Sequence, residues 1–361
     1  MKAAVYEGQE SIVVRDLPDP VLEDGEVLVK IEACCVCGSD RRTYRHGHAS
    51  IPPPRVLGHE FCGTVVESRA AEHVDLKVGD RVVMYIVMPC GTCQPCMEGK
   101  VNICLTRKTM AYHFDGAYAE YTRIPAVAVA AGGLVKVESE APSAHMALSE
   151  PVGCAINAHG RLKIGLKDTV AVFGAGPVGI IHAVLARLQG AQKVFMLAPQ
   201  SKRLKGAEAF DVDACVAVTD DGAHKDEIMR LTGGYGCSVV ISACNSAQAQ
   251  IDAVEIAARS GRIEFFGGLP KSDPTAALNT NLLHYKEITV TGSFSEKMSD
   301  FQASVALIQS GRFPADKIVT HMLPLDRMTE AFDLMDSGEC LKPCIDPRLC
   351  GPDVPSGTSI A

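Results

Sequence analysis

Four cysteines stand close together in a short glycine-containing stretch. They are Cys90, Cys93, Cys96 and Cys104, and their spacing is C-x2-C-x2-C-x7-C. Separations this short let four thiolates converge on one point, as in a tetrahedral structural zinc site. Disulfides are the alternative, but nothing in the chain indicates secretion, and buried free thiols suit a polar segment poorly. The spacing therefore predicts a closed zinc lobe over about residues 89–105.

A second set of candidate metal ligands lies within the first 60 residues. Cys37, in VCGSD, and the pair His59-Glu60, in GHEFCG, offer a thiolate, an imidazole and a carboxylate. A catalytic zinc typically takes three protein ligands and leaves one position for water or substrate. On spacing alone, a structural cysteine and a hydrogen-bonded histidine explain these residues equally well. Cys34 and Cys37 also form C-x-x-C, but no thioredoxin-like unit surrounds them.

A glycine-rich turn follows the apolar segment TVAVF. Gly174, Gly176 and Gly179 form G-x-G-x-x-G at the start of a helical stretch. The first glycine permits a tight turn, the second lets a pyrophosphate approach the backbone, and the third allows close helix–strand packing. An ordinary strand–turn–helix is the alternative. We predict a dinucleotide-binding turn that also includes Pro177 and Val178.

The residue expected to bind the ribose 2'-hydroxyl is missing from the next strand. That strand, KVFML, ends at Ala198, where an acidic residue would select NAD. An uncharged residue removes the repulsion of a 2'-phosphate, and Lys202 or Arg203 could pair with that phosphate. In the alternative, Arg203 packs along the adenosine ribose and the coenzyme is NAD. The sequence leaves NAD and NADP both open.

The hydrophobic pattern changes near residue 154. Before it, short β-branched runs lie between Gly, Pro and Asp, which is typical of a β-rich domain. After it, strand and helix patterns alternate, which predicts a parallel, doubly wound sheet. We expect strands at 237–241 and 262–268 and helices at 223–234 and 246–261. Residues 350–361 are rich in Pro, Gly and Ser and are expected to be loosely ordered.

Length and charge narrow the class of protein. A chain of 361 residues exceeds a single core, so two domains are expected. The net charge of -8 argues against binding to nucleic acid or to an anionic membrane. The N-terminus lacks a signal-peptide pattern, and no run approaches the roughly 20 apolar residues of a membrane span. We expect a cytosolic protein with reduced thiols and a small-molecule substrate.

Six motifs, taken together, resemble those of the zinc-dependent medium-chain dehydrogenases, in the polyol (sorbitol) and threonine dehydrogenase-like branch. They appear in family order over nearly the whole chain: VCGSD, LGHEFCG, VGDRV, the four-cysteine lobe, SEPVGCAINA and VFGAGPVG. The resemblance implies an α/β protein with a GroES-like β-rich catalytic domain at 1–153 and 294–361. It implies a Rossmann coenzyme domain at 154–293.

The resemblance also implies roles for individual residues. It places a catalytic zinc between the two domains, with Cys37, His59 and Glu60 as ligands and Glu150 as a fourth or exchanging ligand. Ser39 would handle the substrate proton. Zinc would act as a Lewis acid that favours hydride transfer to the nicotinamide. Relatives further suggest a homodimer or homotetramer joined through the nucleotide-binding sheets.

One position departs from the family pattern. Several relatives carry a histidine five residues after the cysteine ligand, but this chain has Arg42, which cannot shuttle a proton at neutral pH. Together with Tyr44 and Arg45, it belongs to a basic stretch that could recognise a polyhydroxylated, phosphorylated or carboxylated substrate. A solvated basic loop is the alternative.

The predicted function is an NAD(P)-dependent zinc alcohol dehydrogenase with two zinc ions per chain. We expect it to act on a secondary alcohol of a polyol, sugar or cyclitol, or on the matching ketone. The alternatives are a threonine dehydrogenase-like amino alcohol oxidase, a plain alcohol or aldehyde reductase, and a nucleotide-binding homologue without catalysis.

Overall fold

A computed structural model describes residues 1–349 of the chain. The expectation for residues 350–361 lies outside the described part. The chain divides into two compact units, Met1–Gly153 with Glu296–Ala361 and Cys154–Ser295. Within residues 1–349, no helix is both long and apolar enough to cross a membrane.

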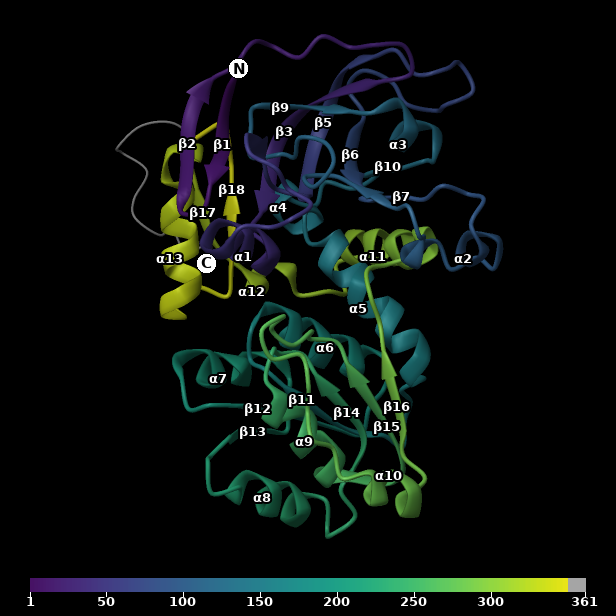
Figure 1. Cartoon of the computed structure of the whole chain (residues 1–361), viewed down its shortest axis with the longest axis vertical. Helices are drawn as coiled ribbons and strands as arrows, with labels where there is room; N and C mark the ends of the chain where they lie inside the picture. Colours follow the sequence, from purple (N-terminus) through teal and green to yellow (C-terminus); the bar gives the residue numbers. More distant parts are fainter. Residues whose placement is uncertain (350–361) are drawn as a thin grey trace. The chain divides into compact units, whose positions relative to one another are not determined.

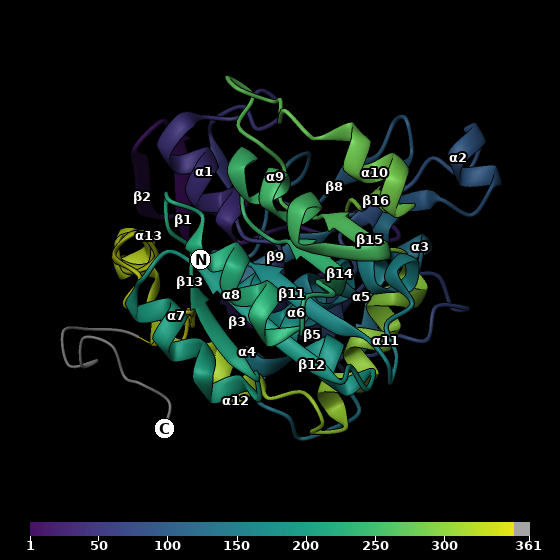
Figure 2. The ribbon, with the colours of Figure 1, turned by 90° about the horizontal axis from the view of Figure 1, so that it is seen from below.

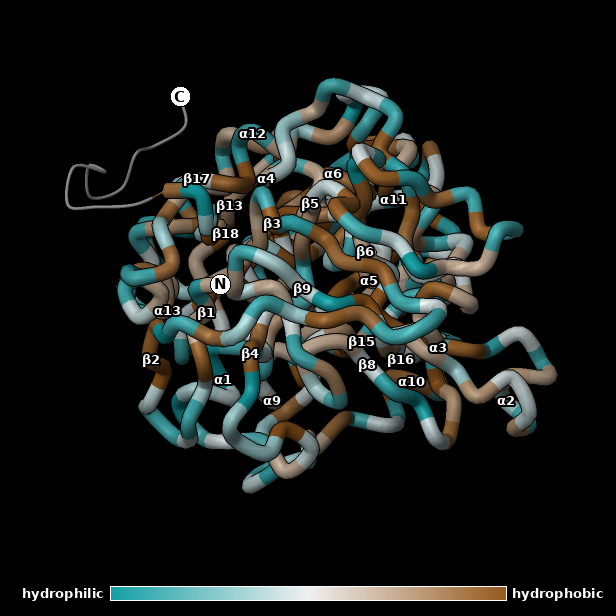
Figure 3. The backbone as a smooth tube through the Cα atoms, turned by 90° about the horizontal axis from the view of Figure 1, so that it is seen from above, coloured by the Kyte–Doolittle hydropathy of each residue, from teal (hydrophilic) through white to brown (hydrophobic). Residues whose placement is uncertain are grey.

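Unit 1 is built on a mostly antiparallel sheet (Figure 1). Its strand order is β10 (Leu134–Lys136), β6 (Arg81–Met84), β5 (Glu60–Ser68), β3 (Val27–Cys35), β18 (Lys342–Ile345) and β17 (Val319–Leu323), and β9 (Tyr121–Ile124) also pairs with β3. The centre is buried because β3 and β5 alternate apolar residues such as Val29, Ile31 and Val65, all 0% exposed. Hydrophobic stretches follow these strands along the backbone (Figure 3).

Smaller sheets and helices complete unit 1. A three-stranded sheet has the order β2 (Ser11–Asp16), β1 (Lys2–Gly8), β4 (Arg55–Val56), and a two-stranded sheet pairs β7 (Val87–Met88) with β8 (Lys108–Thr109). The helices are α1 (Gly38–His46), α2 (Gln94–Met97), η1 (Val101–Ile103), α3 (Ala126–Ala130), α4 (Ser143–Met146), α11 (Met298–Gln309), α12 (Ala315–Ile318), η3 (Leu325–Arg327) and α13 (Met328–Ser337). Helix α5 (Ser149–Leu162) contains the boundary between the units.

Unit 2 is a parallel six-stranded sheet with helices on both faces (Figure 2). Its order is β13 (Ala214–Ala217), β12 (Lys193–Ala198), β11 (Thr169–Phe173), β14 (Cys237–Ser242), β15 (Ala257–Phe265) and β16 (Thr289–Gly292). The helices are α6 (Pro177–Leu188), α7 (Lys202–Gly206), η2 (Ala207–Phe210), α8 (Ala223–Leu231), α9 (Ala247–Ile256) and α10 (Thr280–Lys286). The direction in which successive strands are added to the sheet reverses between β11 and β14. Doubly wound sheets bind their ligands at such a reversal.

One predicted helix extends too far towards its C-terminal end. The sequence predicts a helix over 246–261, but α9 ends at Ile256 and residues from Ala257 onward belong to β15. Ala257 pairs with Cys237, and Ser260 takes a positive φ of 54°. Alanine favours a helix locally, and strand pairing overrides that preference here. The predicted class, a β-rich domain plus a doubly wound parallel-sheet domain, is confirmed.

Candidate active site

Three predicted metal ligands converge in unit 1. The Sγ atom of Cys37, a ring nitrogen of His59 and a carboxylate oxygen of Glu60 all lie within 4.8 Å of one another. Strand pairing brings these residues together. Glu60, at the start of β5, lies opposite Cys35, which is two residues before Cys37. A thiolate, an imidazole and a carboxylate at this separation form a donor set suited to zinc.

A glycine turn presents His59 to this group. Gly58 takes a φ of +92°, and a Cβ atom there would lie 2.8 Å from the Tyr118 ring and 2.9 Å from the Sγ atom of Cys34. Both the backbone conformation and the available space therefore require glycine. The turn directs the imidazole of His59 towards Cys37.

Asp40 contacts two of the three candidate ligands, Cys37 and His59. Its Oδ2 atom accepts hydrogen bonds from the Cys37 amide at 3.2 Å and from the Tyr118 hydroxyl at 2.7 Å. Its Oδ1 atom lies 3.4 Å from Nδ1 of His59. A carboxylate beside one imidazole nitrogen fixes the ring and leaves the other nitrogen, Nε2, for a metal ion.

Buried charge surrounds the three ligands. Burial lowers the pKa of His59, but Asp40 and Cys37 outweigh that effect and raise it well above its usual value. Lys342 lies 2.6 and 2.8 Å from the two carboxylate oxygens of Glu60, and both side chains are almost fully buried. The negative surroundings of His59 would attract a cation.

Glu150 lies outside this ligand group. Its carboxylate instead lies within 4.8 Å of that of Glu296, which is fully buried. Burial, followed by the charge of Glu296, raises the pKa of Glu150 to about 8, and the charges of His59, Glu60 and Lys342 also act on it. Two of the three ligands, His59 and Glu60, thus act on Glu150, although Glu150 does not belong to their cluster.

The predicted substrate residues of α1 have other contacts. The Tyr44 ring is buried and stacks on Phe332 at a centroid distance of 4.9 Å. Arg45 pairs with Asp333 at 3.1 Å and Asp336 at 3.0 Å, both on α13. Arg42 is exposed. These contacts favour a packing role for Tyr44 and Arg45, while substrate recognition by this stretch stays a prediction.

The four lobe cysteines also converge. The Sγ atoms of Cys90, Cys93, Cys96 and Cys104 lie within 4.8 Å of one another. The Cys93 amide donates to Sγ of Cys90 at 3.3 Å, and the Cys90 amide donates to Sγ of Cys104 at 3.3 Å. Backbone amides, first that of Thr92, lower the pKa of Cys90 to about 5, and so favour the thiolate that binds zinc.

The glycine fingerprint forms the turn between β11 and α6 in unit 2. Gly174 takes a φ of +110°, and Gly176 begins the helix with no atom within 4 Å of a potential Cβ. A Cβ at Gly179 would lie only 1.7 Å from the Gly174 carbonyl oxygen. Pro177 and Val178 form the first turn of α6, whose free amides are suited to phosphate groups.

Ala198 lies at the same edge of the sheet. It is the last residue of β12, which runs parallel to β11 with Leu197 opposite Phe173. Ser201 then caps α7 by accepting the Leu204 amide at 3.2 Å. Lys202 is exposed and Arg203 is partly exposed on that helix.

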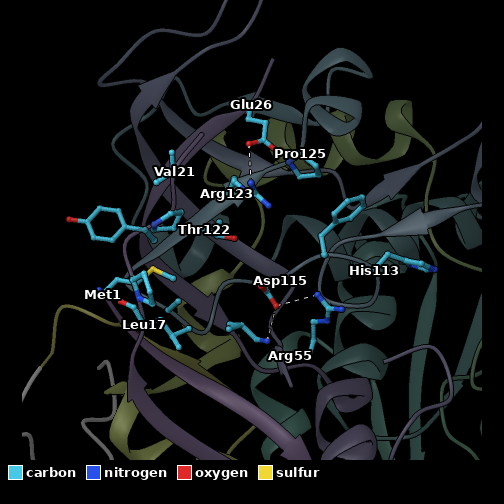
Figure 4. A pocket seen from close by; sticks show the side chains of 17 residues that line it. Met1, Leu17, Val21, Glu26, Arg55, His113, Asp115, Thr122, Arg123 and Pro125 are labelled. Carbon is cyan, nitrogen blue, oxygen red and sulfur yellow. Dashed lines mark hydrogen bonds and ion pairs between the residues drawn. The ribbon is translucent and has the colours of Figure 1, made fainter. Parts of the chain in front are cut away.

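A separate cavity of about 460 Å³ lies elsewhere in unit 1 (Figure 4). Its charged lining residues are already paired, Arg55 with Asp115 at 3.3 Å and Arg123 with Glu26 at 3.4 Å. Cys37, His59 and Glu60 do not line it. This cavity is therefore separate from the candidate metal ligands.

Comparison with known proteins assigns the family. Residues 23–134 match the alcohol dehydrogenase GroES-like domain, and residues 177–310 match the zinc-binding dehydrogenase domain. An L-threonine 3-dehydrogenase of Bacillus velezensis is 31% identical over 96% of this chain and 99% of its own length. This chain belongs to the zinc-dependent dehydrogenases.

Other zinc-dependent dehydrogenases support the polyol and threonine dehydrogenase branch. A sorbitol dehydrogenase of Bombyx mori is 32% identical over 94% of this chain and 97% of its own. A zinc-binding dehydrogenase structure from Sinorhizobium meliloti, bound to NADP, matches with a TM-score of 0.86 and 28% identity over 96% of this chain and 99% of its own. A 2R,3R-butanediol dehydrogenase structure from Bacillus subtilis matches with a TM-score of 0.85 and 28% identity, over 96% and 99%.

Sequence reasoning assigned no role to four residues near the ligands: Asp40, Tyr112, Glu296 and Lys342. Asp40 stands inside the VCGSD motif and could have been found as the residue three after Cys37. Lys342 had only a weak signal in the sequence, because it is a lone lysine at the start of a short apolar strand. Its partner Glu60 lies 282 positions away in the sequence.

Proposed function

We propose that this zinc-dependent dehydrogenase transfers a hydride between a nicotinamide coenzyme and a secondary alcohol of a polyol, sugar or cyclitol, or the matching ketone. The observation that carries the proposal is the convergence of Cys37, His59 and Glu60 in unit 1. The glycine turn of unit 2 adds a place for the dinucleotide.

Zinc held by Cys37, His59 and Glu60 would supply Lewis-acid polarisation of the substrate oxygen. Other residues of the chain would position the ligands, balance their charge and transfer the proton. Asp40 fixes the His59 ring, Lys342 balances the charge of Glu60, and the Ser39 hydroxyl accepts and passes on the substrate proton. We propose Glu150 as an exchanging ligand, as the family pattern implies, because the charges of His59 and Glu60 act on its carboxyl group.

The coenzyme phosphates would lie on the first turn of α6. Gly176 leaves the space that a pyrophosphate needs, and the helix amides supply donors. Ala198 offers no carboxylate to a ribose, and Lys202 and Arg203 stand close in sequence. NADP is therefore as well supported as NAD, and kcat/KM for both coenzymes decides between them. A strong preference for NAD would contradict pairing of these cations with a 2'-phosphate.

A second zinc would be structural and held by Cys90, Cys93, Cys96 and Cys104. Four thiolates leave no open position, so this ion would stabilise the lobe and not bind substrate. We further propose a cytosolic homodimer or homotetramer. Strand β16 lies at the edge of its sheet and is only partly covered, so it could pair with a second copy.

The amino alcohol alternative keeps support from the similarity to an L-threonine 3-dehydrogenase. The test is an NAD(P)-linked activity screen of the zinc-loaded protein over sugars, polyols, cyclitols and amino alcohols. Turnover of polyols, sugars or cyclitols supports the proposal. Turnover of amino alcohols alone supports the alternative, and inactivity on every substrate, with a single zinc per chain, supports a non-catalytic homologue.

A further inference from the structure

The cavity of about 460 Å³ in unit 1 has no part in the proposed chemistry (Figure 4). Its volume lies within the range of roughly 300–1,000 Å³ that is typical of small-molecule sites. Most of its lining comes from four segments, within residues 17–26, 55–56, 113–119 and 121–125. All four segments belong to unit 1, so the cavity is a feature of that unit by itself.

Much of the cavity wall is apolar and stiff. The larger apolar lining residues include Leu17, Pro18, Pro20, Val21, Phe114 and Pro125. A proline ring fixes the backbone φ angle and leaves no N–H donor, so three of these residues offer a preformed apolar surface. The Phe114 ring also contacts Lys108, whose Nζ atom lies 5.8 Å from the ring centroid. Such walls suit a flat apolar ring.

The arginines and carboxylates of the lining form pairs with each other. Arg55 lies 3.3 Å from Asp115, and Arg123 lies 3.4 Å from Glu26. Each positive charge is therefore balanced by a negative charge of the protein. An anion or a cation in the cavity would have to compete with these pairs, so the lining favours a neutral occupant.

Two polar atoms of the lining residues are buried without a hydrogen-bond partner. They are Oγ1 of Thr122, a side chain that is 2% exposed, and Nε of Arg55, and neither bonds another atom of the described residues. Buried polar groups are hydrogen-bonded in the great majority of cases, so these two atoms indicate a partner that occupies the cavity. Both atoms carry a hydrogen, and an oxygen acceptor therefore fits them.

We propose that this cavity binds a small neutral molecule that has a flat apolar ring and a carbonyl oxygen. The ring packs against the prolines and Phe114, and the oxygen accepts hydrogen bonds from Thr122 and Arg55. Water alone is the competing occupant. The site is distinct from that of the proposed reaction, because none of the candidate zinc ligands lines the cavity.

The test is a fluorine NMR titration of the zinc-loaded protein with para-fluorobenzamide. This probe is neutral, has a flat ring and an amide oxygen, and is neither an alcohol nor a ketone that the proposed reaction would consume. We expect saturable binding with a Kd of about 1 mM, as is reasonable for a molecule of this size. Thr122→Val keeps the shape of the side chain and removes the hydroxyl, so it should raise Kd by about tenfold. It should not lower Tm, because the hydroxyl bonds no protein atom.

Three further variants sharpen the test. Arg55→Lys keeps a positive charge beside Asp115 and removes the Nε donor, so it should raise Kd by about threefold or more. Thr109→Val is the matched control, because it removes another buried hydroxyl without a partner that lies outside the lining, and it should leave Kd unchanged. Cys37→Ser removes a candidate zinc ligand and should bind the probe as wild type does.

Three results would overturn the inference. Without saturable binding, the cavity holds water alone. A Kd unchanged in both Thr122→Val and Arg55→Lys places the probe elsewhere on the protein, and loss of binding in Cys37→Ser places it at the zinc. If Thr122→Val does not fold, Arg55→Lys decides by itself. None of these results contradicts the proposed function, which turnover of alcohols tests separately.

Discussion

Asp40 shows how one buried carboxylate can fix several parts of a metal site. It binds the Cys37 amide and the Tyr118 hydroxyl and lies beside the His59 ring. Desolvation by burial raises the pKa of Asp40, but the nearby His59 and these hydrogen bonds bring it below its usual value. The carboxylate is therefore charged at neutral pH and remains an acceptor for all three groups.

The buried ion pair of Lys342 and Glu60 predicts a stability effect that depends on zinc. Removing it by Lys342→Met leaves the carboxylate of Glu60 buried without its cation, which should destabilise the metal-free protein by about 3 kcal/mol. A bound zinc would supply positive charge in its place. The loss in Tm should therefore be larger in metal-free than in zinc-loaded protein, as measured by thermal unfolding of both forms.

Lys342→Arg is the matched control, because it keeps the charge and should lose less stability. Equal losses of Tm with and without zinc in Lys342→Met would contradict the idea that Glu60 interacts with a metal.

A buried histidine pair in unit 2 predicts a pH dependence. Nε2 of His159 lies 3.1 Å from Nδ1 of His182, and Nδ1 of His159 lies 2.7 Å from the Gln189 side-chain oxygen. Burial lowers the pKa of His159 to about 4. The unfolded chain binds this proton near pH 6.5 and the folded chain does not. The contribution of neutral His159 to stability is therefore complete above pH 6.5 and falls by about 3 kcal/mol as the pH drops to about 4.

Urea unfolding at several pH values measures this loss. His159→Gln should flatten the curve between pH 6.5 and 4.5, whereas replacement of the exposed His73 by Gln should leave it unchanged. A wild-type stability that stays constant over this range would show that the pair accepts protons without cost.

At the element scale, two glycines of the β11–α6 turn are expected to have different roles, Gly176 in coenzyme binding and Gly179 in folding. Gly176→Ala places a methyl group in open space, so the protein should fold with an unchanged Tm. The methyl would nevertheless obstruct the pyrophosphate, and the coenzyme Kd should rise by about tenfold or more. Gly179→Ala should instead lower Tm, because its methyl would overlap the Gly174 carbonyl.

Calorimetric titration with NAD and NADP, together with thermal unfolding, measures both effects. Coenzyme affinity unchanged in Gly176→Ala would place the dinucleotide elsewhere.

Local pattern predicted much of the fold at this scale. β-branched runs indicated β3 and β5, and the glycine fingerprint located β11 and α6 because its chemistry is local. The helix predicted over 246–261 failed at its end because alanine-rich residues from Ala257 join a strand. Helix preference is weak compared with pairing inside a sheet.

At the scale of the whole chain, long-range pairing was the part least visible in the sequence. Strands β17 and β18, near the end of the described chain, join the sheet of β3, with Cys344 opposite Cys35. Only the resemblance to the family implied that the C-terminal segment joins the first domain again. The same pairing carries Lys342 to Glu60, which explains why motif spacing found the ligands but not the lysine.

Zinc analysis of the whole protein, combined with coenzyme-linked turnover, tests the central claim most directly. The claim is that zinc bound by Cys37, His59 and Glu60 is catalytic. We expect two zinc ions per chain in wild type, one in Cys37→Ser with turnover lost, and one in Cys96→Ser with the lobe ion lost. Two zinc ions and full turnover in Cys37→Ser would contradict it.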